Sequence, residues 1–275
     1  MIIVIQCKDK TGLVAAISSL LAAHGANIVS MREHVDAFDN RFFVRIEVTG
    51  DVVAGNLQQQ LQSALPEEAD IKINPLPEKK IIVLVTKEYH CLGDILLRNH
   101  FKTLGAKVQC VIGNHPDLSD ICKRFGIPFH CVTHEQRSKP DFEKALLDVI
   151  SKYPADYLVL AKFMRILSPG FVRQFPMRII NIHHSFLPAF AGAHPYKQAY
   201  ERGVKLIGAT AHFVTDELDE GPIIAQQIIP VTHSFTPADM MRAGKEIEKA
   251  VLARALHLVF EDSVLVYQNK TIVFD

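Results

Sequence analysis

An asparagine and a histidine two residues apart, Asn181 and His183, are the side chains of this protein best suited to act on a carbonyl group. They come at the end of an apolar run, residues 178–182, where a turn-rich loop begins. Side chains alternate between the two faces of an extended chain, so both project to one side and His184 to the other. An imidazole can transfer a proton, and an amide N–H can stabilise an oxygen that becomes negative. The pair therefore predicts attack on a carbonyl.

An acidic turn downstream could add a carboxylate to this pair. Residues 205–214 and 223–231 both read as strands, and residues 215–222 form the turn between them. The acidic residues of this turn are Asp216, Glu217, Asp219 and Glu220. One of them could point at His183, where a carboxylate fixes the tautomer of the ring and raises its basicity. Since no Ser or Cys lies in a nucleophile elbow, the pattern favours attack without a covalent enzyme intermediate.

Two other interpretations of the histidines stay open from the residues alone. His183, His212 and Asp219 could bind a metal ion as two histidines and a carboxylate, although the sequence has no HExxH pattern. A single histidine is more often a structural residue, and this is the simpler interpretation of His184 and His194.

The elements that must position these residues alternate between strand and helix. Strands are expected at residues 81–86, 106–112, 128–132, 157–161 and 178–182, and helices at 92–104, 117–125 and 140–152. The first strand, IIVLVT, is apolar throughout, as expected for a strand covered on both faces. This rhythm predicts a doubly wound, mostly parallel sheet that binds its ligand at the carboxyl ends of the strands.

Two loops at the carboxyl ends of strands indicate which kinds of ligand the sheet could bind. The turn after the first strand, residues 86–94, holds one glycine and two acidic residues, so it cannot form the glycine-rich cradle that binds phosphate. The loop at residues 163–167 is apolar apart from Arg165. From the residues alone we favour its packing on the next helix over a role as one wall of a pocket for a flat aromatic ligand.

The N-terminal part reads as a smaller domain in the order β-α-β-β-α-β. Strands are expected at residues 2–7, 27–38, 41–49 and 70–73, and helices at 13–24 and 54–65. This order predicts a ferredoxin-like sandwich. The proline-containing stretch NPLPEKK follows and reads as a short, stiff connector. We therefore expect domains at residues 1–76 and 81–275, joined by a linker at 77–80.

Composition limits the range of functions. The chain has 30 basic and 30 acidic residues, so no overall field favours nucleic acid or an anionic membrane. No apolar run approaches the length of a membrane span. Five scattered cysteines form no metal-binding spacing and fit a reduced compartment better than a disulfide framework. With no leader-like segment at its start, the chain is expected to be a cytoplasmic protein.

The N-terminal stretch DKTGLVAAISSLLAAHGANIVS, with the hairpin that follows it, resembles an ACT domain. The resemblance implies pairing of these domains edge to edge, hence a homo-oligomer. It also implies that a small effector binds at the loop after the first strand, with Asp9, Gly12 and Asn27 as its site. Alternatively, Gly12 and Asn27 only shape turns.

The segment NIHHSFLPAFAG, followed by GATAHFVTDELDEGPII, is similar to the formyltransferases over about residues 80–275. The resemblance implies that Asn181, His183 and Asp219 are the catalytic amide, imidazole and carboxylate, that Thr210 and His212 support them, and that no metal is used. It also implies that two loops form the walls of a pterin pocket. The pocket residues are then Phe163, Met164, Arg165, Ile166, Leu167, Val214, Thr215, Asp216 and Leu218.

An ACT-like domain joined to a formyltransferase-like domain, with HCLGD and NIHHSFLP, resembles the formyltetrahydrofolate deformylases. Transformylases that act on a ribonucleotide have a glycine-rich phosphate loop in place of HCLGD, and proline in place of His184. The resemblance implies hydrolysis of 10-formyltetrahydrofolate to formate and tetrahydrofolate, which supplies formate for purine synthesis and balances the one-carbon folate pool. It implies no cofactor besides this folate substrate, and methionine and glycine as effectors.

Two alternatives remain beside hydrolysis. One is folate-dependent formyl transfer to an amine acceptor. The other is a folate- or amino-acid-responsive regulator with an idle catalytic domain, although an idle domain has no reason to keep Asn181, His183 and Asp219 together. Whether Asp219 or His183 takes the proton is a question of coupled groups that the sequence leaves open.

Overall fold

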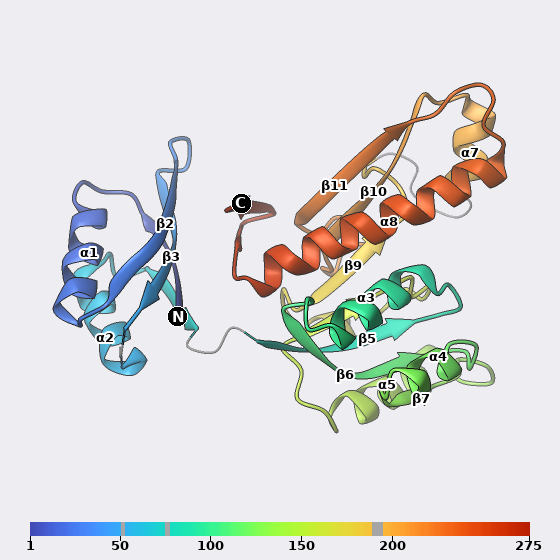
Figure 1. Cartoon of the computed structure of the whole chain (residues 1–275), viewed down its shortest axis with the longest axis horizontal. Helices are drawn as coiled ribbons and strands as arrows, with labels where there is room; N and C mark the ends of the chain where they lie inside the picture. The colour runs from blue at the N-terminus through green and yellow to red at the C-terminus, as the bar shows by residue number, and fades with distance from the viewer. Residues whose placement is uncertain (51–52, 75–77, 189–194) are drawn as a thin grey trace. The chain divides into compact units, whose positions relative to one another are not determined.

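The computed structural model describes residues 1–50, 53–74, 78–188 and 195–275 and divides into two compact units (Figure 1). The first unit comprises Met1–Pro77 together with Leu258–Tyr267 and Ile272–Asp275. The second comprises Glu78–His257 and Gln268–Thr271. Residues 75–77, where the sequence places the domain boundary, lie outside the described residues, so the expected linker at 77–80 stays a prediction.

The first unit is an antiparallel sheet with two helices on one face. Its elements are β1 (Ile2–Lys8), α1 (Leu13–Ala23), β2 (Asn27–Asp36), β3 (Arg41–Thr49), α2 (Ala54–Ala64) and β4 (Asp70–Asn74). The strands lie in the order β2-β3-β1-β4. Ile3 and Ile5 alternate with outward residues on β1 and pack against Ile17 of α1 and Leu57 of α2. The predicted ferredoxin-like order is confirmed.

C-terminal residues cover part of the other face of this sheet. They come from the hairpin of β12 (Val264–Tyr267) and β13 (Lys270–Val273) and from the residue after it. Phe43 is fully buried there with Leu265 and Phe274, and its ring meets that of Tyr267 edge to face at 5.6 Å. The sequence had assigned the whole of residues 81–275 to the larger domain. The structure differs because β3 is apolar on both faces.

The second unit is built on a seven-stranded sheet. Its elements are β5 (Lys79–Val85), α3 (His90–His100), β6 (Ala106–Gly113), α4 (Ser119–Arg124), β7 (Phe129–Cys131), α5 (Lys139–Ile150), β8 (Tyr157–Leu160), α6 (Pro169–Val172), β9 (Ile179–His183), α7 (Pro195–Arg202), β10 (Leu206–Phe213), β11 (Ile223–Pro230) and α8 (Pro237–Phe260). The strands lie in the order β11-β10-β9-β8-β5-β6-β7. Strands β5 to β9 are parallel to one another, β10 pairs antiparallel with β9, and β11 pairs antiparallel with β10. The predicted mostly parallel α/β sheet is confirmed.

Apolar burial on both faces stabilises this sheet. Residues 81–85 of β5 are all fully buried, so successive side chains of both orientations lie in the core. Ser138 is the N-cap of α5, and its hydroxyl accepts the Asp141 N–H. The helix packs Phe142 and Leu146 on one face of the sheet.

The order of strands also determines where a ligand can bind. Strand β5 comes first in the chain yet lies between β6 and β8, so the direction of winding reverses beside it. In open α/β sheets the crevice at such a reversal, at the carboxyl ends of the strands, is the usual binding site. The loops after β5, β8 and β9 meet at this edge of the sheet.

Two further facts concern the whole described chain. All five cysteines are free. Within residues 1–50, 53–74, 78–188 and 195–275, no helix is both long enough and apolar enough to cross a membrane.

Candidate active site

A cavity of about 350 Å³ lies at the carboxyl ends of β8 and β9. Its volume falls in the range of pockets for small molecules. Its lining residues come from the loop after β8, the end of β9, and the end of β10 with the turn after it. They are Leu160, Lys162, Phe163, Met164, Arg165, Ile166, Leu167, Asn181, Ile182, His183, His184, His212, Val214, Thr215, Asp216, Glu217, Leu218 and Asp219.

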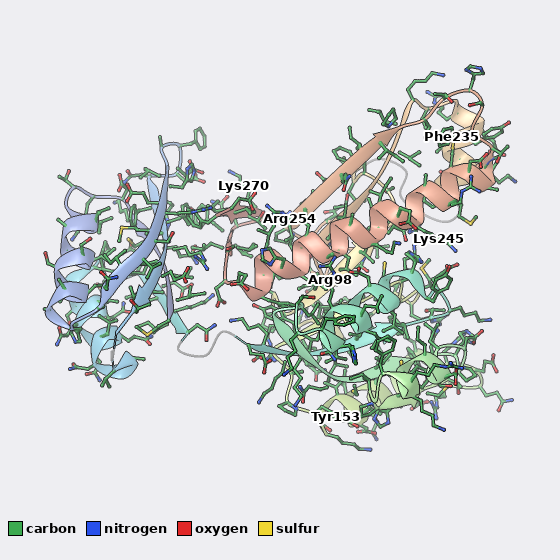
Figure 2. The ribbon with its side chains drawn as sticks, viewed as in Figure 1. Arg98, Tyr153, Phe235, Lys245, Arg254 and Lys270 are labelled. Carbon is green, nitrogen blue, oxygen red and sulfur yellow. The ribbon has the colours of Figure 1, made fainter. Side chains whose placement is uncertain are left out.

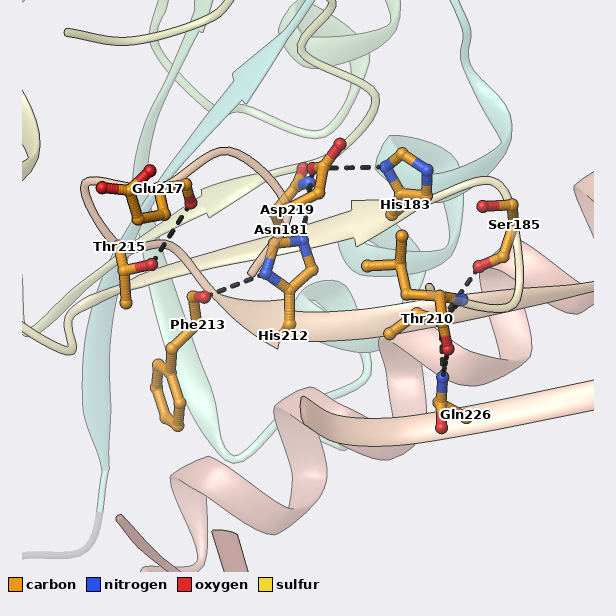
Figure 3. Close-up of polar contacts among 11 residues, drawn as sticks. Asn181, His183, Ser185, Thr210, His212, Phe213, Thr215, Glu217, Asp219 and Gln226 are labelled. Atoms are coloured by element: carbon orange, nitrogen blue, oxygen red, sulfur yellow. Dashed lines mark hydrogen bonds and ion pairs between the residues drawn. The ribbon is translucent and has the colours of Figure 1, made fainter. Parts of the chain in front are cut away.

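Of the acidic residues of the turn, Asp219 is the one that meets the histidine of β9. Its Oδ1 lies 3.3 Å from His183 Nδ1 and 3.7 Å from His212 Nε2 (Figure 3). The hydrogen bond with His183 lowers the pKa of the Asp219 carboxyl below its ordinary value, against the opposing effect of burial. The carboxylate therefore stays ionised at neutral pH and orients the His183 ring.

Strand pairing brings the amide to the same place. In the antiparallel register of β9 and β10, His212 lies directly opposite Asn181. His212 Nδ1 donates to the Phe213 carbonyl at 2.9 Å, which leaves Nε2 to accept the Asn181 Nδ2–H at 3.2 Å (Figure 3). Burial lowers the pKa of His212, so this ring is neutral and fixes the amide without competing for the proton chemistry.

Thr210 supports the site from beneath the loop after β9. It is fully buried opposite His183, donates to the Ser185 carbonyl at 2.9 Å, and accepts the Leu187 N–H at 3.0 Å. Gln226 on β11 donates to both the Thr210 hydroxyl and the Leu187 carbonyl. The sequence missed Gln226, although its position on the strand opposite Thr210 could have pointed to it.

The two predicted pocket loops both line the cavity, but their side chains divide between the cavity and the core. Phe163 is 5% exposed and stacks on Phe142 of α5, so it packs in the core with Leu167. Met164 and Ile166 are 56% and 63% exposed. The packing that the residues alone favour is thus present at Phe163 and Leu167, while the role of this loop as the wall of a pterin pocket stays a prediction.

The metal interpretation of His183, His212 and Asp219 finds no support in the geometry. Among the residues that the structure describes, only His90, Cys91 and Glu248 bring three ligand atoms within 4.8 Å of one another. His184 stacks on His183 with ring centres 4.9 Å apart. His194, for which the sequence favoured a structural role, lies outside the described residues.

The predicted effector residues lie at turns of the first unit. Gly12 has a left-handed backbone (φ 93°) just before α1 and accepts the Ala16 N–H. The N–H of Asp9 donates to the Asn40 carbonyl, and Asn27 begins β2. The structure shows Gly12 in the turn-shaping role, and an effector site stays a prediction.

A conformational requirement at Gly221 gives a prediction about the acidic turn. Asp219 itself has a left-handed backbone (φ 58°), and a Cβ on Gly221 would lie only 1.7 Å from the Phe213 carbonyl oxygen. Gly221→Ala is therefore expected to displace the turn and lower kcat at least about tenfold, because misplacing a catalytic group by about 1 Å is costly. Steady-state kinetics measures this.

The matched control is Gly93→Ala in α3, where an added Cβ meets nothing within 4 Å. Its activity should equal that of the wild type. Equal activity in Gly221→Ala would show that the turn tolerates displacement and that Asp219 needs no fixed position.

Comparison with known proteins identifies two families in one chain. Residues 79–256 match the formyl transferase family and residues 1–65 match the ACT domain family. A protein of Haemophilus influenzae named formyltetrahydrofolate deformylase is 49% identical over 272 residues, 99% of this chain and 98% of that protein. One of the same name from Bacillus subtilis is 43% identical over 279 residues, covering 99% and 93%.

Solved structures agree. The crystal structure of a formyltetrahydrofolate deformylase from Pseudomonas syringae matches with a TM-score of 0.94 and 40% identity, over 100% of this chain and 94% of that one. Glycinamide ribonucleotide transformylase 1 from Symbiobacterium toebii matches with a TM-score of 0.69 and 31% identity, over 72% of this chain and 95% of that one. The resemblance predicted from the sequence is confirmed, and this chain belongs to the family of formyltetrahydrofolate deformylases.

Proposed function

We propose that this protein hydrolyses 10-formyltetrahydrofolate to formate and tetrahydrofolate, with Asn181, His183 and Asp219 as its catalytic residues. The observation that carries the proposal is the contact of Asp219 with His183, beside Asn181, in the wall of a single cavity. Relatives matched over nearly the full length of the chain are named formyltetrahydrofolate deformylases, which supports this substrate.

The first half of the reaction is the attack of water on the formyl carbon. Asp219, through or beside His183, takes a proton from the water as its oxygen bonds to that carbon. The electron pair of the C=O bond moves to the formyl oxygen. One Asn181 N–H is held by His212, and the other donates to this oxyanion together with protonated His183.

The second half breaks the bond between the formyl carbon and N10. The oxyanion re-forms its C=O bond, the electron pair of the C–N10 bond moves to N10, and N10 takes the proton that the water gave up. The remaining hydroxyl proton passes to solvent, and the product leaves as formate. The group that received the proton is thereby returned to its starting state. No group outside the substrate and water is consumed, and we propose that the protein needs no cofactor.

The pterin is proposed to lie between the two loops of the cavity. The exposed Met164 and Ile166 offer apolar contact, while buried Phe163 and Leu167 hold the loop on the core. The N–H of Met164 donates to the Thr86 hydroxyl at 2.9 Å, and Asp216 pairs with Arg173 at 2.6 Å. Both contacts fix the walls before a ligand arrives.

The test is incubation with 10-formyltetrahydrofolate and no amine. We expect formate and tetrahydrofolate in equal amounts, with formate measured by a coupled dehydrogenase and tetrahydrofolate by chromatography. Formate only in the presence of an added amine would establish transfer instead. No turnover under either condition would favour a regulatory protein.

Regulation and assembly belong to the same proposal. Strand β2 is an edge of the ACT sheet, and pairing there would give a homo-oligomer. Amino acids such as methionine and glycine are the proposed effectors, at the loop that holds Asp9 and Gly12. Five free cysteines fit the proposed cytoplasmic location.

A further inference from the structure

Two buried polar atoms of the segment that follows β9 make no hydrogen bond within the described part of the chain. They are Nε2 of His183 and Oγ of Ser185. His183 is 6% exposed and Ser185 is 4% exposed. Buried polar groups almost always have a partner in the protein, in ordered water or in a ligand. Unpaired atoms at this place therefore indicate a partner that arrives with the substrates.

The other unsatisfied atoms of the described residues differ from these two in their surroundings. Gln6 Oε1, Arg41 Nε, His90 Nδ1 and Asn114 Oδ1 are also buried without a hydrogen bond. His90 Nδ1 has a charged neighbour, since Glu88 lies 3.7 Å away and pairs with Lys245, labelled in Figure 2, at 2.6 Å. None of these four belongs to the segment that carries Asn181 and His183.

The contact with Asp219 determines the hydrogen-bonding role of His183 Nε2. Asp219 Oδ1 lies 3.3 Å from Nδ1 of the ring, and this hydrogen bond lowers the pKa of the carboxyl, which stays ionised. A carboxylate only accepts, so it binds the tautomer that carries its proton on Nδ1. Nε2 of the neutral ring then has a lone pair and requires a donor.

The Ser185 side chain lies on the Nε2 side of this ring. In Figure 3 its hydroxyl points toward the side of the His183 ring that faces away from Asp219. The main chain is fixed there, because Thr210 donates to the Ser185 carbonyl at 2.9 Å and accepts the Leu187 N–H at 3.0 Å. The carbonyl of Ser185 thus holds the loop, and the hydroxyl has no part in that.

A water molecule suits both atoms. Nε2 of the neutral ring accepts, and a serine hydroxyl can accept or donate. An anion would find no counter-ion at these two atoms and would lie beside the Asp219 carboxylate. An apolar group would leave both atoms unpaired. A water that donates one O–H to each atom satisfies the two together.

We infer that Ser185 and His183 together hold the water that attacks the formyl group, which makes Ser185 a further catalytic residue. The inference rests on the proposed hydrolysis and names a residue that binds its second substrate. With one O–H directed to His183 Nε2 and the other to Ser185 Oγ, an oxygen lone pair is left to face the formyl carbon.

The step balances within the proposed reaction. As the water oxygen bonds to the formyl carbon, the O–H directed at His183 breaks and its proton goes to Nε2. Asp219 stabilises the imidazolium that results. The second hydrogen stays on the oxygen, hydrogen-bonded to Ser185, until the product leaves. Ser185 makes and breaks no covalent bond.

Ser185→Ala tests the inference because activity and stability should respond differently. The change should lower kcat for formate release by about 10- to 100-fold and leave the KM for the folate nearly unchanged, since the water loses one of its two partners. The melting temperature should not fall, because the hydroxyl makes no hydrogen bond within the described chain. Steady-state kinetics and thermal denaturation measure these quantities.

Two further variants assign the effect. Thr210→Val removes a buried hydroxyl that bonds to Ser185, Leu187 and Gln226, so its melting temperature should fall by several degrees. Ser185→Cys keeps the shape and a weaker hydrogen-bonding group, and it should recover part of the activity that Ser185→Ala loses.

Wild-type kcat in Ser185→Ala would overturn the inference, as would a loss of kcat accompanied by a lower melting temperature. A burst of tetrahydrofolate ahead of formate in the wild type would also overturn it, because that would show a formyl group bound covalently to the serine. In each of these cases the wild type still releases formate, and the proposed hydrolysis stands. Absence of formate from the wild type would instead contradict the hydrolysis itself.

Discussion

Asp219→Asn is expected to lower kcat for formate release by at least about 10³-fold while leaving the affinity for the folate nearly unchanged. Asparagine keeps the size and one oxygen of the side chain but cannot hold the charge that stabilises a protonated His183 at 3.3 Å. Because we propose that Asp219 serves the proton transfer, directly or through His183, its loss should appear in kcat. Steady-state kinetics and a direct titration with tetrahydrofolate separate the two effects.

The acidic turn offers its own control for this prediction. Glu220 follows Asp219 directly and is exposed, so Glu220→Gln removes the same charge beside the site without touching His183. Its kcat should stay within about twofold of the wild type. If Asp219→Asn keeps more than a tenth of wild-type turnover, another group activates the water and the assignment of the carboxylate is wrong.

Local sequence rules predicted the part of the site that depends on strand period. Asn181 and His183 share a face because an extended chain alternates, and the antiparallel neighbour then sets His212 opposite Asn181. The choice among the acidic residues came from the family resemblance. In the structure, the position of Asp219 beside His183 depends on the left-handed backbone of Asp219 and on the close approach of Gly221 to Phe213. Local sequence preferences predict neither feature.

The contacts of buried Glu248 with His90, Lys162 and Tyr196 could not be predicted because these residues are far apart in the chain. His90 and Glu248 are 158 residues apart, and the contact exists only after the sheet has formed. A weak signal was present: Glu248 continues the buried stripe of α8 that includes Val251, Leu252 and Ala255. A charged residue on an apolar stripe is rarely buried without a partner.

The C-terminal hairpin was missed for a related reason. Val4 and Phe43 point away from the helices of the ACT unit, and both pack against residues from the end of the chain. An antiparallel sheet commonly leaves one face to solvent, so two covered faces are not the default expectation. The sequence did indicate a second covered face, because apolar residues occupy both alternating sets of positions along β3.

The second large effect concerns Glu248 and the stability of the fold. Burial alone would raise the pKa of this carboxyl, but the His90 and Tyr196 hydrogen bonds and the Lys162 charge outweigh it and lower the pKa to about 2. A carboxyl whose pKa is lower when folded contributes stability above its unfolded value, near 4.5, and loses it as the pH falls to 2. The difference is worth about 3 kcal/mol.

Glu248→Gln should therefore be less stable than the wild type by about 3 kcal/mol at neutral pH, since Lys162 is left without its counter-ion in a buried site. Below pH 4.5 the gap should narrow, because the wild type loses the contribution of this carboxylate and glutamine has none to lose. Urea unfolding at a series of pH values measures both quantities. Glu246→Gln, exposed on the same helix, should keep the wild-type slope. Parallel pH curves for the wild type and Glu248→Gln would mean that the pKa of Glu248 is not lowered in the folded protein and that its carboxylate does not stabilise the fold.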